Sequence, residues 1–99
     1  MNPIVIRYSA KPEGADQNAK LVEGVFRELD ARKPEGVRYL VLRLEDGFFV
    51  HIVAYDGEEE GLTSLPAFKT FQQEAGEFRA EAPIRRDAEV VGNYRMLAD

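Results

Sequence analysis

The apolar and polar positions change their period along this chain, and the changes predict an order of strands and helices. Residues 4–9 are β-branched and aromatic and are followed by turn residues, which predicts a first strand. From residue 15 to about 33 apolar residues recur at helical spacing, with charged residues on the other face. The apolar stripe of this predicted helix consists of Leu21, Val22, Val25, Phe26 and Leu29.

The middle of the chain predicts a β-hairpin whose two faces are both largely apolar. Residues 37–44 and 48–55 read as strands, and Asp46-Gly47 between them is a strong tight-turn signal. A two-residue turn there pairs Leu42 with His51. One face then carries Leu40, Leu42, Leu44, Phe49, His51, Val53 and Tyr55. The other face carries Tyr39, Val41, Arg43, Phe48, Val50, Ile52 and Ala54.

The second half of the chain predicts another helix and a last strand. Thr63 or Ser64 can cap the helix, Pro66 is tolerated in its first turn, and Ala82-Pro83 ends it. The segment from about residue 87 to residue 96 is the predicted fourth strand. The apolar stripe of the second helix consists of Leu65, Phe68, Phe71, Ala75 and Phe78.

This order of elements predicts one α+β domain over residues 1–99, a ferredoxin-like βαββαβ sandwich. Its four-stranded antiparallel sheet carries both helices on one face. An antiparallel sheet with one solvated face alternates apolar and polar residues, and this hairpin does not. We therefore expect a second copy of the chain to cover the open face, as a homodimer. The expected contacts are Val41, Phe48, Val50 and Ile52.

Composition narrows the function classes. The chain has 99 residues and no cysteine, which excludes disulfides, thiolate catalysis and cysteine-ligated metals. Its net charge of -5 disfavours nucleic acid as a partner, because that binding needs lysine and arginine to neutralise phosphates. Neither a membrane-spanning apolar run nor a leader is visible, so we expect a soluble, cytoplasmic protein. The polar segment 56–61 is predicted to be an exposed acidic loop rather than a metal site.

The element order, the two-faced hairpin and the stretches 49–55 and 65–71 together resemble the antibiotic biosynthesis monooxygenase-like family. The resemblance implies a dimeric α+β barrel that oxidises phenolic or quinol-type substrates with oxygen and without a metal or flavin cofactor. Characterised members carry an asparagine on the third strand and a tryptophan four positions later, both facing the pocket between sheet and helices. The matching positions here are His51 and Tyr55.

His51 is the only histidine, so every histidine-based mechanism depends on it. A neutral imidazole with an ordinary pKa near about 6.5 can take a proton from a phenol. Tyr55 lies about 13 Å further along the same strand face, at roughly 3.3 Å per residue, and is predicted to orient the ligand. A planar aromatic ligand fits between the two residues. The expected walls of the binding site are Phe49, Val53, Phe68 and Phe71.

Three alternatives stay open on the sequence alone. His51 can be a hydrogen-bonded structural residue in a non-catalytic homodimer that binds a small ligand or has its pocket filled by side chains. It can also be the axial ligand of a haem. Arg85 and Arg86 can pair with an anionic ligand or form surface ion pairs. An open cavity of a few hundred Å³ beside His51 would support the enzyme, whereas a packed one would support the first alternative.

Overall fold

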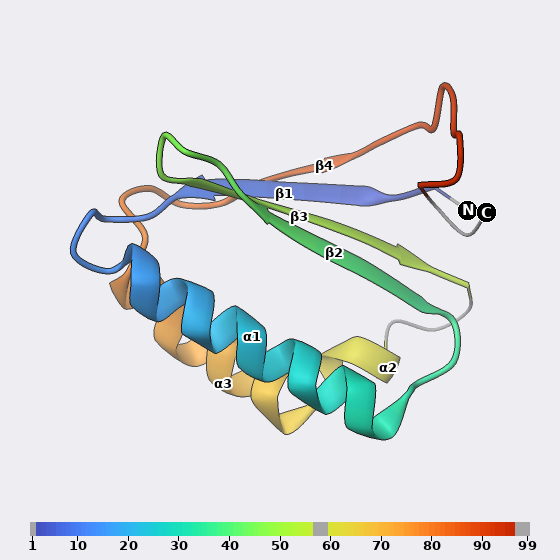
Figure 1. Ribbon diagram of the computed structural model, residues 1–99, viewed down its shortest axis with the longest axis horizontal. Coiled ribbons are helices and arrows are strands. Elements are labelled where there is room, and N and C mark those ends of the chain that lie inside the picture. Colours follow the sequence, from blue (N-terminus) through green and yellow to red (C-terminus); the bar gives the residue numbers. More distant parts are fainter. Residues whose placement is uncertain (1, 57–59, 97–99) are drawn as a thin grey trace.

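Helices cover one face of a single antiparallel sheet (Figure 1). The computed structural model describes residues 2–56 and 60–96. In chain order its elements are β1 (Ile4–Ser9), α1 (Ala15–Arg32), β2 (Val37–Arg43), β3 (Phe48–Tyr55), α2 (Glu60–Thr63), α3 (Pro66–Glu74), η1 (Ala75–Glu77) and β4 (Ile84–Asp87). The four strands lie in the order β2-β3-β1-β4, and every neighbouring pair is antiparallel. This architecture confirms the predicted ferredoxin-like α+β fold.

The loop of the β2-β3 hairpin is longer than the predicted two-residue turn. The N–H of Gly47 donates to the carbonyl of Leu44 at 3.1 Å, and the N–H of Leu44 donates to the carbonyl of Phe48 at 2.8 Å. Gly47 adopts a φ of 92°, in the left-handed region that glycine enters without a steric penalty. A type I turn followed by a left-handed glycine is the usual three-residue hairpin loop. The two-residue prediction was therefore wrong by one residue.

That one residue exchanges the two faces of β2. Val41, not Leu42, pairs with His51. Val41 therefore lies on the helix side, and its predicted place in a dimer contact was wrong. Leu40 and Leu42 take its place on the open face, where they are 40% and 41% exposed. The open-face residues of β3 follow the predicted alternation: Phe48, Val50, Ile52 and Ala54.

The second predicted helix is a short helix followed by a longer one. Thr63, predicted as a cap, is the last residue of α2, and α2 begins inside the segment predicted to be a loop. The N-cap residue of α3 is Leu65, which makes no side-chain cap. Glu28 of α1 supplies the missing acceptor, because its Oε1 accepts a hydrogen bond from the Ala67 N–H at 2.9 Å. This contact holds α3 beside α1.

The last strand is earlier and shorter than the predicted segment 87–96. β4 comprises only four residues and pairs with the first four residues of β1. The N–H of Ala88 donates to the carbonyl of Pro3 at 2.9 Å, just beyond the start of β1 at Ile4. Because β1 begins at Ile4, it offers no backbone with which residues after 88 could pair. Arg85 and Arg86 lie inside β4 and are exposed.

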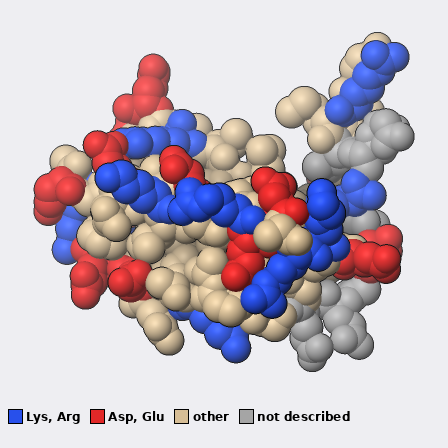
Figure 2. All heavy atoms as spheres, turned by 60° about the horizontal axis from the view of Figure 1, so that its bottom comes forward, with Lys and Arg blue, Asp and Glu red and all other residues tan. Residues whose placement is uncertain are grey.

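Charged side chains of both signs are scattered among uncharged residues in the view of Figure 2, in which the bottom of Figure 1 comes forward. Lysine and arginine alternate there with aspartate and glutamate. This mixed surface is typical of a solvated helix face. Among the described residues, no helix is long and apolar enough to cross a membrane.

Candidate active site

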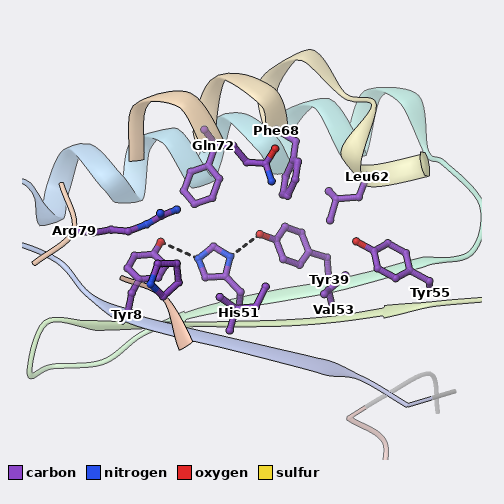
Figure 3. A pocket seen from close by; sticks show the side chains of 12 residues that line it. Tyr8, Tyr39, His51, Val53, Tyr55, Leu62, Phe68, Gln72 and Arg79 are labelled. Atoms are coloured by element: carbon purple, nitrogen blue, oxygen red, sulfur yellow. Dashed lines mark hydrogen bonds between the residues drawn. The ribbon is translucent and has the colours of Figure 1, made fainter. Parts of the chain in front are cut away.

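A cavity of about 350 Å³ lies between the helix face of the sheet and α3 (Figure 3). Strands β1, β2 and β3 form its floor, and α2, α3 and the chain after η1 form the rest of its wall. Most of the lining is aliphatic or aromatic. The polar side chains that line it are Tyr8, Tyr39, His51, Tyr55, Gln72 and Arg79. An open apolar cavity with a few convergent polar groups is the usual form of a small-molecule site.

The cavity includes five of the six predicted site residues: His51, Tyr55, Val53, Phe68 and Phe71. The ring centres of His51 and Phe71 are 5.5 Å apart, so α3 places an aromatic wall against the imidazole. Phe49 is the exception. It is 1% exposed and stacks on Tyr8 with ring centres 5.7 Å apart, outside the lining of the cavity. Phe49 therefore lies in the core and not in the lining of the cavity, where we had expected it.

Both ring nitrogens of His51 bond to tyrosine hydroxyl groups. The Tyr8 hydroxyl lies 2.9 Å from Nε2, and the Tyr39 hydroxyl lies 2.6 Å from Nδ1. His51 is only 3% exposed, and the two tyrosines flank it on opposite sides, as the dashed lines of Figure 3 show. These contacts form a continuous chain of hydrogen bonds along the floor of the cavity, which we call the Tyr8-His51-Tyr39 chain.

Asn18 of α1 sets the direction of this chain. Its Nδ2 donates to the Tyr8 hydroxyl at 2.9 Å, and its side chain is fully buried. Because Tyr8 accepts from Asn18, its own proton is free to point at Nε2 of His51. This direction predicts that Nδ1 carries the histidine proton and donates it to Tyr39. The remaining Tyr39 proton is available to an oxygen atom of a ligand in the cavity.

Burial controls the protonation of the whole chain. Burial first, and then the Arg79 charge, lower the pKa of His51 to about 4. Burial also raises the pKa of Tyr39 and of Tyr8, and the Asn18 hydrogen bond and the Arg79 charge partly offset the rise for Tyr8. At neutral pH the three side chains are therefore uncharged. The pKa of His51 lies well below the ordinary histidine value of about 6.5, because the imidazole is almost completely desolvated.

The three residues that hydrogen-bond in this chain with His51, which are Tyr8, Tyr39 and Asn18, were missed from the sequence. Tyr8 lies on the same face of β1 as Ile4 and Ile6, but the register between β1 and β3 has no local signal. Tyr39 was assigned to the wrong face by the hairpin shift. Asn18 had a signal, because it precedes Val22 by four residues and so continues the apolar stripe of α1 with a polar side chain.

The site does not fit a haem iron bound through His51. Each ring nitrogen already has a tyrosine hydroxyl within hydrogen-bond distance, so iron would have to displace one of them. Among the residues described, no group of three or more His, Cys, Asp or Glu side chains is placed to hold a metal ion.

No protein-family model and no curated protein matches this chain. Solved structures do match it. A candidate antibiotic biosynthesis monooxygenase from Nitrosomonas europaea has a TM-score of 0.77 at 14% identity, over 93% of this chain and 100% of that one. Another candidate, from Caulobacter crescentus, has a TM-score of 0.72 at 19% identity, over 92% and 90% of the two chains. A structure described as an antibiotic biosynthesis monooxygenase has a TM-score of 0.73 at 15% identity, over 93% and 100%.

Identities this low show a shared fold and leave the chemistry to the site. The resemblance inferred from the sequence is therefore confirmed for the fold.

Proposed function

We propose that this protein is a cofactor-independent monooxygenase of the antibiotic biosynthesis monooxygenase-like family that acts on phenolic or quinol-type substrates. The observation that carries the proposal is the Tyr8-His51-Tyr39 chain on the floor of an apolar cavity. The shared fold with proteins of that description supports it. The open cavity of about 350 Å³ also favours a ligand-binding protein over a dimer whose pocket is filled by side chains.

The reaction requires no electrons beyond those of the substrate. A quinol takes up one molecule of oxygen, one oxygen atom enters the ring as a hydroxyl group, and the other leaves as water. The ring C–H bond and the two quinol O–H bonds are lost as the hydroxyquinone forms. Reduction of oxygen needs four electrons. Conversion of the ring C–H bond to C–OH supplies two of them, and oxidation of quinol to quinone supplies the other two.

The chain's own residues move the first proton. The quinol hydroxyl donates to the Tyr8 oxygen, while Tyr8 passes its own proton to Nε2 of His51. The products of this step are an imidazolium and a quinolate, which attract each other in a site of low dielectric. Tyr39 donates its proton in a hydrogen bond to the substrate, and the quinolate then transfers an electron to oxygen. Tyr55, at the other end of the cavity, orients the ligand (Figure 3).

Oxygen consumption with 1,4-dihydroxynaphthalene, without added metal or flavin, tests this proposal. We expect uptake above the autoxidation blank and, with isotope-labelled oxygen gas, one labelled atom in the hydroxyquinone. Formation of hydrogen peroxide and unlabelled quinone would show an oxidase instead. No uptake across a panel of quinols and phenols would favour the alternative of a non-catalytic binding protein.

The proposed assembly is a homodimer that uses the open face of the sheet. Leu40, Leu42 and Leu44 are exposed there beside the apolar open face of β3, and a second copy is the simplest cover for them. Met96 and Pro3 line a small depression with Leu40 on the same face. We assign the protein to the cytoplasm, with a small molecule rather than nucleic acid or membrane as its other partner.

A further inference from the structure

Arg79 is the one charged side chain among the described residues that line the cavity. Its guanidinium carbon lies 5.1 Å from the centre of the Tyr8 ring. Its Nε is buried and has no hydrogen-bond partner among the described residues. A buried donor without an acceptor is costly, and it is a common mark of a position that a ligand completes.

The backbone fixes the position of this arginine. The N–H of Ala80 donates to the Ser9 carbonyl at 2.8 Å, and the N–H of Lys11 donates to the Phe78 carbonyl at 2.7 Å. Arg79 itself is bridged to Ala10. The residue is therefore attached to the end of β1, next to Tyr8, and its guanidinium points toward the Tyr8-His51-Tyr39 chain (Figure 3). A site built on such a rigid element needs little ordering when a ligand binds.

The absence of a carboxylate partner is unexpected in an acidic protein. The chain has 18 acidic and 13 basic residues, yet the ion pairs of the described residues join Arg32 to Glu28 and Arg43 to Asp16. Arg79, which is partly buried and lies over the Tyr8 ring, has none among these residues. A guanidinium at the wall of an apolar cavity binds an anion more strongly than it does in water.

We propose that Arg79 binds a carboxylate group of the substrate, and that the substrate is a planar hydroxy-aromatic carboxylate. The inference rests on the proposed function for the role of the hydroxyl group, which bonds to Tyr8. Arg79 and Tyr8 lie on the same side of His51, so the carboxylate and the hydroxyl occupy neighbouring ring positions (Figure 3). The aromatic ring lies against Phe68 and Phe71. Sequence reasoning assigned a possible anion contact to Arg85 and Arg86, which lie exposed on β4.

Calorimetric titration with a matched pair of ligands tests the charge recognition directly. The probes are 1-hydroxy-2-naphthoate and its uncharged amide, which have the same shape and are not quinols. We expect the carboxylate to bind the wild-type protein about ten- to a hundredfold more tightly than the amide. In Arg79→Gln the two probes should bind equally, and Arg79→Lys should keep part of the preference. Arg43→Gln, which removes an exposed arginine that pairs with Asp16, is the control and should keep all of it.

Equal binding of the two probes to the wild-type protein would overturn the proposal, as would failure of both to bind or a preference that persists in Arg79→Gln. The wild-type comparison needs no variant, so it holds even if Arg79→Gln does not fold. Oxygen uptake is measured separately. A carboxylate preference without oxidation of any quinol, carboxylated or neutral, supports the Arg79 site and contradicts the monooxygenase. Oxidation of neutral quinols without any carboxylate preference supports the monooxygenase and contradicts the Arg79 site.

Discussion

The hydroxyl group of Tyr39 lies 2.6 Å from Nδ1 of His51, although the hairpin pattern predicted these two side chains on opposite faces of the sheet. A second tyrosine, Tyr8, bonds to the other ring nitrogen. The imidazole is therefore held in one orientation and is neutral near pH 7. A proton that reaches it from the cavity passes through a tyrosine.

The tautomer of His51 is the first prediction. Because Asn18 donates to Tyr8, we expect Nδ1 to carry the proton and Nε2 to be bare in the wild-type protein at pH 7. Asn18→Asp replaces the donor by an acceptor of the same size and should move the proton to Nε2. Nitrogen NMR of labelled histidine distinguishes the two forms. The same tautomer in both proteins would contradict control by Asn18.

Removing each tyrosine hydroxyl separately tests the route of the proton. Tyr8→Phe should lower kcat at least about a hundredfold, because the quinol proton loses its path to His51. It should also reduce the free energy of unfolding by about 1–3 kcal/mol, since Asn18 and Nε2 lose their buried partner. Tyr39→Phe removes a single hydrogen bond to the substrate and should cost kcat about tenfold. A larger effect from Tyr39→Phe would mean that the proton enters from the other end.

His51→Gln separates catalysis from stability. The glutamine cannot bond to both tyrosines as the ring does, so the free energy of unfolding should fall by about 1–3 kcal/mol. Turnover per folded molecule should fall about a hundredfold or more, because the proton acceptor is gone. Urea unfolding measures the first quantity, and oxygen uptake corrected for the folded fraction measures the second. Unchanged specific activity of the folded variant would remove His51 from the mechanism.

The pH dependence should show the lowered pKa of His51, about 4 in the folded protein. The acidic limb of kcat/KM, which reports the free enzyme, should therefore fall near pH 4. In the unfolded chain His51 has an ordinary pKa of about 6.5. Lowering the pH from that value to about 4 therefore favours unfolding, by up to about 3 kcal/mol. Above pH 7 this contribution is absent.

His51→Gln is the control for the stability measurement, because it removes the histidine and leaves every carboxylate in place. The difference between the two unfolding curves between pH 7 and pH 4 isolates the His51 contribution. A pH-independent difference would contradict the burial of a neutral imidazole.

Self-association is tested on the open face of the sheet, which carries Leu40 and Leu42 of β2. Leu42→Glu should give a folded monomer, because Leu42 is 41% exposed in the single chain but central to the proposed contact. Sedimentation at micromolar concentration compares it with the wild type, which we expect to be dimeric. Lys20→Glu on the exposed side of α1 changes a charge elsewhere and should leave the dimer intact. A stable wild-type monomer would contradict the proposed interface.

The order of the main elements, and the side of the sheet or helix from which five of the six proposed site residues line the cavity, could be predicted from the sequence, because both depend on local periodicity. The stripe of α1 and the alternation of β3 are properties of consecutive residues, and they place His51 and Tyr55 on one face without knowledge of any other strand. The same alternation put Phe49 on the correct face. It did not show that Tyr8 would stack against that ring.

The partners of His51 were decided only by tertiary structure. One extra residue in the hairpin loop brought Tyr39 to the histidine, and the pairing of β1 with β3 brought Tyr8 there across 43 residues of chain. Strand register depends on loop geometry and on distant packing, and an error of one residue reverses every side chain of a strand. The position of Arg79 has the same origin, because it follows from a backbone bridge to Ala10 that no local pattern encodes.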